Sequence, residues 1–434
     1  MSLPVTAAFE PLPVQAGHDP GPRWRIRFWS IFTGQALSLI GSALTQFVLL
    51  WWITDTTGSV SALATAGMAA LLPQALLSPL GGVLADRYSR RLLMIAADAV
   101  SALCMLALIA LFLTGRIELW HAYLMMAVRS AMQAFQAPAA SASTAMLVPI
   151  SFLPRAAGLN QTLIGLMTVA AAPLGALAIG VMPIGLALGI DVLTALLAIL
   201  SLLVFRIPQP IMPPAERTGL WVEFRGGVEL VWEHPGLRWL YGLLGAVVMV
   251  IMPSFTLVPL LVKEHFGGGA AEVAIMEGVA GAAMIAGGLV VAVLAPKRHI
   301  RWVLWGFAAS CFSLAMAALM PGSMLWAAVI WWGLSGFAFV IGDAPLMALL
   351  QSTIPPHQQG RALSLLTTVM TLGAPVGLAL ASPLGELIGM RWLFVLLGVL
   401  AGCVSLIGFW STALRRFGRR MHEGGGRGVD EGRT

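Results

Sequence analysis

The sequence predicts an all-α membrane protein whose twelve transmembrane helices form two bundles of six. Hydrophobic residues make up 59% of the 434-residue chain and charged residues only 10%, whereas about a quarter of the residues in a soluble domain are charged. Apolar runs of roughly 20 residues recur along the chain, and because a backbone in lipid must satisfy its own hydrogen bonds, these runs have to be helices. An internal repeat then divides the helices into two sets.

Twelve apolar segments can be placed in order, and a polar stretch separates the first six from the last six. The expected spans cover residues 28–53, 61–84, 92–114, 119–144, 158–180, 184–205, 238–262, 271–295, 302–320, 323–350, 361–384 and 391–413. The polar stretch is rich in proline, and we expect a linker that carries a short surface helix there. The predicted domains are an N-terminal tail (1–27), a first bundle (28–205), the linker (206–237), a second bundle (238–413) and a C-terminal tail (414–434).

Basic residues predict how the chain lies in the membrane. With these spans, 21 of the 25 Lys and Arg residues fall in the tails and in the loops that follow even-numbered spans, three fall on the other side, and Arg129 lies within a span. Because cytoplasmic loops are enriched in Lys and Arg, both termini are expected to be cytoplasmic. The polar tail 1–27 lacks the early apolar core of a cleaved signal peptide, so the first span is expected to direct insertion. This one-sided distribution argues against nucleic acid as a partner.

Short segments recur in the two halves about 200 residues apart, and such a repeat indicates the architecture. The recurring pairs are Ala137-Pro138 with Ala344-Pro345 (offset 207), Gly81-Gly82 with Gly287-Gly288 (offset 206) and Ala172-Pro173 with Ala374-Pro375 (offset 202). Halves of the same orientation are related by an axis along the membrane normal. They are expected to enclose a substrate cavity near mid-membrane that opens alternately to either side.

A short charged connection joins the second and third spans. It places Asp86 four residues after Gly82, and three arginines follow the acid. This order and spacing resemble the loop signature of the major facilitator superfamily, with Ser89 at the position of the last glycine. The resemblance implies a cytoplasmic gate that latches the two halves, formed by Gly82, Asp86, Arg87, Arg90 and Arg91. Residues 296–301, the second copy, keep basic residues but lack the acid, so we expect the latch to be asymmetric.

Polar side chains gather on one face of the first span. They follow a spacing of three and four residues and are Gln35, Ser38, Ser42, Thr45 and Gln46. Such a face can line a cavity, or it can hydrogen-bond to neighbouring helices, as Ser, Thr and Gln commonly do in membranes. Both interpretations remain open from the residues alone. The resemblance favours a cavity wall, because the first helix lines the cavity in that superfamily.

The fourth span carries a basic residue far from either of its ends. Arg129, Gln133 and Gln136 follow at i, i+4 and i+7, so they share one helical face, with Arg129 roughly 15 Å from the outer end. A charge at that depth is costly unless it faces water or a partner. We therefore predict that this face lines the substrate cavity, and a structural ion pair is the alternative.

Four acids lie within the predicted spans and could pair with Arg129 or carry protons. They are Asp98, Asp191, Glu277 and Asp343. By the 207-residue offset Asp343 is the counterpart of Gln136, so a cation in one half and an acid in the other could face one cavity. A carboxylate in a low dielectric can exchange a proton near neutrality, which suits proton coupling. Asp343 is the preferred candidate, followed by Asp98 and Asp191, although each acid can equally be a packing residue.

Enzymatic activity is not expected. The chain has no phosphate-binding G-x-x-x-x-G-K-[ST], no H-E-x-x-H and no cysteines with metal spacing, so no metal site and no cofactor are predicted. A nucleotide-driven pump would need a soluble domain of on the order of 100 to 200 residues. We expect the proton motive force to supply the energy, and protons, membrane lipids and a small amphipathic substrate to be the partners of a monomer.

The most detailed resemblance is to the macrolide-efflux subgroup of the superfamily. It rests on Leu72-Pro73-Gln74-Ala75, on Met94 to Asp98, on Val128-Arg129-Ser130 with Ala134 to Ala139, and on Ile190-Asp191-Val192 with Arg206-Ile207-Pro208. It implies a drug:proton antiporter of a bacterial inner membrane, which exports a macrolide-like molecule by alternating access. Two alternatives remain: export of an endogenous metabolite such as a siderophore, and a polytopic receptor or assembly factor that transports nothing.

Overall fold

The structure is a computed structural model. It describes residues 21–207, 228–229, 231–294, 299–354 and 356–411, and these contain helices but no strand. In chain order the helices are α1 (Trp24–Thr57), α2 (Val60–Arg87), α3 (Arg90–Leu113), α4 (Leu119–Leu147), the 3-10 turn η1 (Ile150–Phe152), α5 (Leu153–Val181), α6 (Ile184–Ala187), α7 (Gly189–Val204), α9 (Pro235–Phe266), α10 (Ala270–Leu294), α11 (His299–Leu319), α12 (Leu325–Thr353), α13 (Pro356–Ile388) and α14 (Met390–Ile407).

A helix stands at each of the twelve predicted spans, which confirms the predicted fold class. The sixth span is divided at Leu188 into the short α6 and the longer α7. Eleven spans of the described chain are long and apolar enough to cross a membrane. The remaining span is α4, which has 29 residues but includes Arg129, Gln133 and Gln136. Hydropathy therefore supports α4 least as a membrane span, because α4 carries these polar residues on its interior face.

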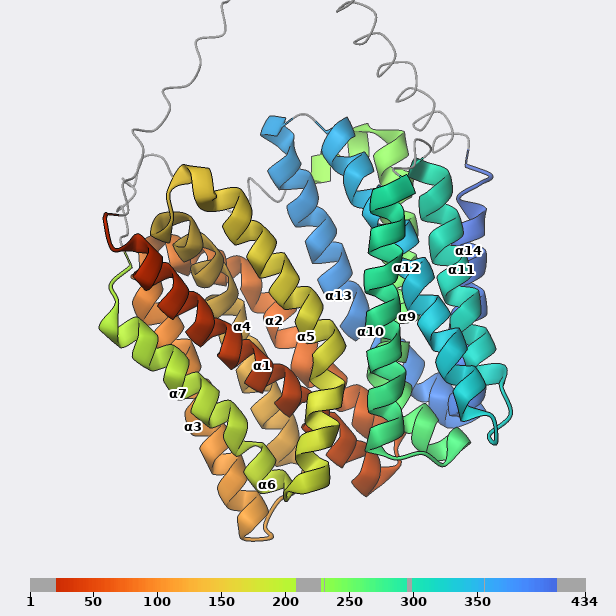
Figure 1. The fold of residues 1–434 in the computed structure, drawn as a ribbon. Helices are drawn as coiled ribbons and strands as arrows, with labels where there is room; N and C mark the ends of the chain where they lie inside the picture. The colour runs from red at the N-terminus through yellow and green to blue at the C-terminus, as the bar shows by residue number, and fades with distance from the viewer. Residues whose placement is uncertain (1–20, 208–227, 230, 295–298, 355, 412–434) are drawn as a thin grey trace, which may run out of the picture.

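Most of the predicted linker and both tails lie outside the described residues, as does the surface helix expected within the linker. The same holds for residues 296–298 of the second charged loop, whereas residues 299–301 form the start of α11. The described chain runs from Gly21 to Ser411, and α1 begins and α14 ends at the same end of the helices (Figure 1). We call this end the termini side and the opposite end, where α1 turns into α2, the far side.

The helices form two groups that stand side by side. In Figure 1, α1 to α7 occupy the left of the view and α9 to α14 the right, with α5 and α10 facing each other in front. Contacts within each group follow the same order, because α2 packs on α4 and α1 on α7 in the first group, while α10 packs on α12 and α9 on α14 in the second. We call these groups the first half and the second half.

Paired glycines show that the internal repeat is built into the helix packing. A Cβ atom on Gly81 in α2 would overlap the carbonyl oxygen of Ala134 in α4, and a Cβ atom on its repeat partner Gly287 would lie 2.7 Å from the carbonyl oxygen of Phe337 in α12. Without a side chain, each glycine lets two helix backbones approach closely, as small residues commonly do in membranes. The repeated glycines therefore bring the equivalent helix pairs together in both halves, α2 with α4 and α10 with α12.

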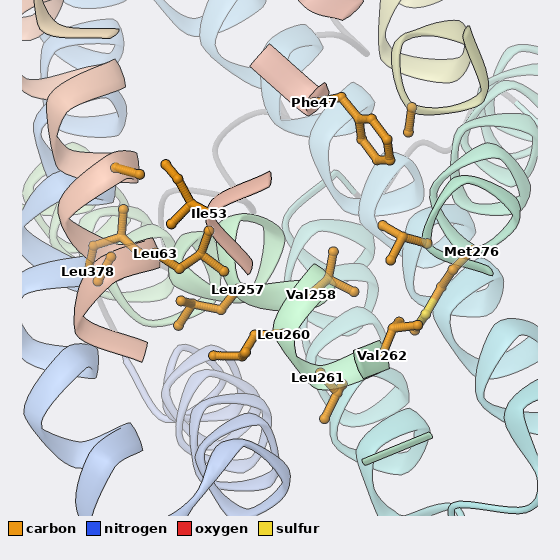
Figure 2. Close-up of a cluster of buried hydrophobic side chains, with 14 of the residues drawn as sticks. Phe47, Ile53, Leu63, Leu257, Val258, Leu260, Leu261, Val262, Met276 and Leu378 are labelled. Carbon is orange, nitrogen blue, oxygen red and sulfur yellow. The ribbon is translucent and has the colours of Figure 1, made fainter. Parts of the chain in front are cut away.

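An apolar cluster joins the two halves toward the far side. It combines Phe47 and Ile53 of α1 and Leu63 of α2 with side chains of α9, α10 and α13 (Figure 2). Small residues bring the same helices together, since a Cβ on Gly67 would lie 2.6 Å from Thr256 and 2.8 Å from Leu378. Tightly packed apolar side chains exclude water, so this cluster closes the space between the halves at that depth.

An ion pair reinforces this closure at the far side. The Lys263 ammonium, in the last turn of α9, lies 2.9 Å from Oδ1 of Asp55 at the end of α1. It also donates to the backbone carbonyls of Asp55 (2.6 Å) and Thr54 (3.3 Å). A cation at the C-terminal end of a helix is favoured by the helix dipole, so one residue of the second half caps the first helix of the first half.

Candidate functional site

A polar cavity lies inside the first half. Its volume is about 390 Å³, at the lower end of the range of ligand pockets. The described residues that line it come from all six spans of this half and include Ser38, Ser42, Gln46, Gln74, Asp98, Ser101, Arg129, Ser130, Gln133, Gln136, Thr168 and Asp191. Apolar side chains such as Met126, Ile164 and Met167 complete the wall. A cavity of this composition can hold a small molecule, or the polar part of a larger one.

The cation of the cavity is paired with an acid of the same half. A terminal guanidinium nitrogen (NH1) of Arg129 on α4 lies 3.0 Å from Oδ2 of Asp191 on α7, and the side chains are only 14% and 5% exposed. The other oxygen of Asp191 accepts a hydrogen bond of 3.1 Å from the Ser42 hydroxyl on α1. Three helices thus meet at one carboxylate, and its negative charge is balanced by the guanidinium.

A second carboxylate in the cavity is held by amides. Asp98 on α3 is 3% exposed. Its Oδ1 accepts a hydrogen bond of 2.6 Å from Nε2 of Gln136, and its Oδ2 accepts one of 3.3 Å from Nε2 of Gln35. Gln136 also donates to the side-chain oxygen of Gln35 at 3.0 Å. Among the described residues Asp98 makes no ion pair, so its charge is solvated by neutral amides alone.

These two groups give the cavity a net negative charge when Asp98 is ionised. Arg129 and Asp191 cancel, and an ionised Asp98 then leaves one uncompensated negative charge. Burying such a charge is costly unless it is neutralised. A proton on Asp98 or a positively charged group in the cavity would each restore neutrality. The amides of Gln35 and Gln136 suit both states, because an amide can donate to a carboxylate through its NH₂ and accept from a carboxyl through its oxygen.

Local sequence features place these side chains. The spacing of Arg129, Gln133 and Gln136 sets them on one face of α4, which the structure turns toward the cavity. In α2, Pro73 interrupts the regular helix, and the backbone N–H of the next residue, Gln74, donates to the Ser130 hydroxyl at 3.0 Å. This bond fixes α2 against α4 beside the guanidinium.

Most of the residues predicted for the cavity are found together. Ser38, Ser42, Gln46, Arg129, Gln133 and Gln136 line it, while Gln35 contacts it through Asp98. Thr45, on the same helix, is instead fully buried and its hydroxyl has no hydrogen-bond partner in the described structure. The polar face of α1 thus serves in part as a cavity wall and in part as a set of interhelical contacts.

Arg129 and Asp343 were expected to face one cavity, with an ion pair between Arg129 and an acid of a neighbouring span as the alternative, and the structure shows such an ion pair. The partner of Arg129 is Asp191, which the sequence left as a third choice for proton coupling. Asp343 lies half-buried on α12 in the second half and is not among the lining residues of this cavity, nor is Glu277 on α10. The reason is geometric, because the guanidinium of Arg129 on α4 reaches Asp191 on α7 across the interior of the first half.

The charged connection between α2 and α3 bonds within the first half. Arg90 donates to the backbone carbonyls of Ala85 and Ala142 at 3.1 Å each. Arg91 donates to the carbonyls of Leu202 and Leu203 at 2.5 and 2.8 Å, which caps the end of α7. Arg87 is exposed, a Cβ on Gly82 would meet nothing within 4 Å, and the side chain of Asp86 is outside the described structure. The predicted latch between the halves therefore stays a prediction.

The sequence reasoning missed several polar residues of the cavity. Ser101 lies three residues after Asp98 on α3, Ser130 follows Arg129, and Gln74 follows a proline. The spacing of Ser101 from Asp98 was a usable signal, because residues at i and i+3 share a helical face. Thr168 on α5 stands alone in an apolar stretch, and nothing local marks it. Within the described residues, no three His, Cys, Asp or Glu side chains gather as a metal site would require.

Comparisons with known proteins agree with this architecture. A family model described as Major Facilitator Superfamily matches residues 31–377 and 303–428. Proteins named Macrolide efflux protein A are 30% identical: the one from Streptococcus pyogenes over 88% of this chain and 95% of its own length, and the one from Enterococcus faecalis over 71% and 96%. A bacterial homologue of the human lysosomal transporter Spinster, solved in an inward-facing and unoccupied conformation, shares the fold with a TM-score of 0.65 and 16% identity. That alignment covers 92% of this chain and 97% of the homologue.

Proposed function

Because the chain belongs to the major facilitator superfamily, we propose that it exports an amphipathic small molecule in exchange for protons, by alternating access across a bacterial inner membrane. The family and the fold are those of transporters, which are not enzymes. The export direction and a macrolide-like cargo are suggested by the names of the relatives. The proton motive force would supply the energy, and the termini side would face the cytoplasm, as the distribution of basic residues predicts.

The observation that carries the proposal is the buried Asp98 carboxylate, whose charge is not balanced by a cation. The neighbouring carboxylate, Asp191, is already neutralised by Arg129 at 3.0 Å. Among the described residues the carboxylate of Asp98 accepts hydrogen bonds only from the amides of Gln35 and Gln136. The cavity therefore has one site at which a proton and a positively charged cargo would compete.

Because a proton and the cargo would compete for the Asp98 carboxylate, one can bind only after the other has left, and their exchange is obligatory. In the proposed cycle, cargo entering from the cytoplasm displaces the proton from Asp98. When the cavity opens outward, a proton neutralises the carboxylate and the cargo leaves. The Arg129–Asp191 pair stays intact and holds α4, α7 and α1 together around the site through the Ser42 hydroxyl. Net movement of one species then requires the return of the other.

The closed far side supports an alternating mechanism. Lys263 and Asp55 join the halves there, next to an apolar cluster that includes Ile53 and Leu63. Opening the cavity outward would require this ion pair to break. An exposed pair contributes only about 0.2 to 1 kcal/mol, so it can form and break in each cycle.

Everted membrane vesicles test the proposal. A respiration-driven, inside-acid pH gradient should be released when the macrolide erythromycin or another toxic amphipathic cation from a compound panel is added. Asp98→Asn should reduce this release at least about tenfold while the protein remains in the membrane, because the amide cannot exchange a proton. Glu118→Gln, which removes an exposed acid outside the cavity, is the matched control and should behave as wild type.

The same assay decides between Asp98 and Asp343. Release that persists in Asp98→Asn but disappears in Asp343→Asn would reverse the assignment made here. A response to metabolites such as siderophores, with none to drugs, would favour the endogenous exporter. If no compound releases the gradient, the receptor or assembly factor becomes the better account.

A further inference from the structure

A second hollow lies on the outside of the second half, away from the polar cavity. It is a groove of about 270 Å³ between the termini-side ends of α9 and α14. Its walls are Arg238, Trp239, Gly242 and Ala246 of α9, and Val404 and Ile407 of α14. The first-half cavity shares none of these residues. The groove therefore needs an explanation of its own.

The floor of the groove is apolar and elongated. Arg238, Gly242 and Ala246 follow at i, i+4 and i+8, so they form a stripe about 12 Å long on α9. A Cβ atom on Gly242 would meet nothing within 4 Å. Because Gly242 and Ala246 are small and no helix of the described chain fills the space beside them, a narrow apolar slot runs along this part of α9. A slot of this shape fits part of a hydrocarbon chain.

The mouth of the groove is cationic and aromatic. Arg238 lies in the first turn of α9, where the helix dipole is positive. Its guanidinium carbon lies 5.6 Å from the centre of the Trp232 ring. Trp232 and Trp239 are 68% and 46% exposed, as tryptophans are where a membrane meets water. In the described part of the chain Arg238 makes no ion pair, so its charge is available to a ligand.

The equivalent helix pair of the first half packs more closely near the same end. There α1 and α7 take the positions of α9 and α14, and a Cβ atom on Gly34 of α1 would lie 2.8 Å from the Ser201 hydroxyl and 3.2 Å from Cα of Ala198. Arg25 lies over Trp24 at 5.5 Å near the start of α1, so an arginine and tryptophan pair is present there too. In the described chain α1 and α7 leave no apolar slot beside Gly34, and this separates a specific site from the general enrichment of arginine and tryptophan at membrane surfaces.

We propose that this groove binds one anionic phospholipid of the leaflet on the termini side. The phosphate would lie against Arg238 and the start of α9, and one acyl chain would occupy the slot over Gly242 and Ala246. A guanidinium binds phosphate through charge-assisted hydrogen bonds. The exposed tryptophans would contact the glycerol region, where their rings prefer to lie. The site does not depend on the transport mechanism proposed above.

Native mass spectrometry of the purified full chain in detergent tests the proposal. Titration with dioleoyl phosphatidylglycerol should give one saturable bound lipid at concentrations where dioleoyl phosphatidylcholine binds at least about fivefold more weakly. Arg238→Gln should weaken phosphatidylglycerol binding about fivefold, because one basic residue near anionic lipid contributes about 1 kcal/mol. Arg25→Gln removes the other arginine of such a pair on the same side and should leave this binding unchanged.

Substitutions that fill the slot test the contribution of the acyl chain separately from that of the headgroup. Gly242→Leu and Ala246→Leu should each abolish saturable binding of both lipids while Arg238 is retained. Gly180→Leu, at an exposed glycine of α5 where a Cβ also meets nothing within 4 Å, is the matched control and should bind as wild type. The proposal is overturned if Arg25→Gln weakens binding as much as Arg238→Gln, if neither arginine matters, or if both leucine variants still bind one lipid. Thermal unfolding of each variant checks that it is folded.

Discussion

α4 and α12 occupy equivalent positions in the two halves, yet they carry different chemistry. The 207-residue offset maps Arg129, Gln133 and Gln136 of α4 onto Gly336, Val340 and Asp343 of α12. Where α4 extends a guanidinium into a cavity, α12 has a glycine on which a Cβ would lie 2.7 Å from the carbonyl oxygen of Ala280. The second half has closed this place by direct helix packing.

Two small polar side chains inside the second half bond to each other. The Ser335 hydroxyl lies 3.1 Å from that of Ser310 and also donates to its carbonyl at 2.9 Å. Trp332, in the same helix, is among the largest fully buried side chains. The comparison teaches that one architecture can hold a charged, polar cavity in one copy and close the equivalent place by helix packing in the other.

The largest effect on this difference between the halves is expected when the cation of the first half, Arg129, is removed. Arg129→Gln leaves Asp191 buried without a counter-charge, and the loss of one partner of a buried pair costs about 3 to 5 kcal/mol. We expect a large drop in the thermal unfolding midpoint in detergent, together with loss of transport. The double variant Arg129→Gln/Asp191→Asn should recover much of the stability but not the transport. A single variant as stable as wild type would show that the pair is not needed to hold the helices.

The shared architecture can be tested at the paired glycines. Gly81→Ala should destabilise the protein by about 1 to 3 kcal/mol, because its methyl group would overlap the carbonyl oxygen of Ala134. Gly287→Ala, with 2.7 Å to the carbonyl oxygen of Phe337, should cost less. The neighbouring Gly82→Ala is the control, since its methyl group meets nothing and alanine favours the helix. Thermal unfolding of the three variants should rank them in this order, and equal midpoints would contradict the close crossings.

The smallest effect is expected where the second half is polar but only structural. Ser335→Ala removes the hydrogen bonds with Ser310, which in a membrane protein are worth about 0.6 kcal/mol. The unfolding midpoint should fall slightly and vesicle transport should not change. Ser42→Ala removes one hydrogen bond in the first half, to Asp191, and should reduce transport. Equal transport by both variants would remove the functional difference between the halves.

Much of the fold could be read from the sequence because its signals are local. Runs of apolar residues, the prolines and glycines of the repeat and the distribution of Lys and Arg each act over one helix or one loop. The helix boundaries differ from the predicted spans by a few residues. The three-and-four spacing on α1 and α4 also placed Ser38, Ser42 and Gln133 on faces that line the cavity.

The pairing of charges could not be predicted in this way. Four acids within the spans could have met Arg129, and sequence distance does not rank them. The choice of Asp191 depends on how far α4 and α7 are rotated and how closely they pack, down to the 3.0 Å between guanidinium and carboxylate. Ser130, which fixes α2 beside Arg129, depends on the same packing.

The sequence by itself determined which segments cross the membrane, where the repeat divides them and which face of α4 is polar, because burial in lipid imposes these patterns residue by residue. Only the tertiary structure decided that Arg129 binds Asp191, that Asp98 is held by two amides, and that the groove is open beside Gly242 but closed beside Gly34. The physical reason is that a contact of 3 Å is set by the rotation and approach of whole helices, which many distant residues determine together.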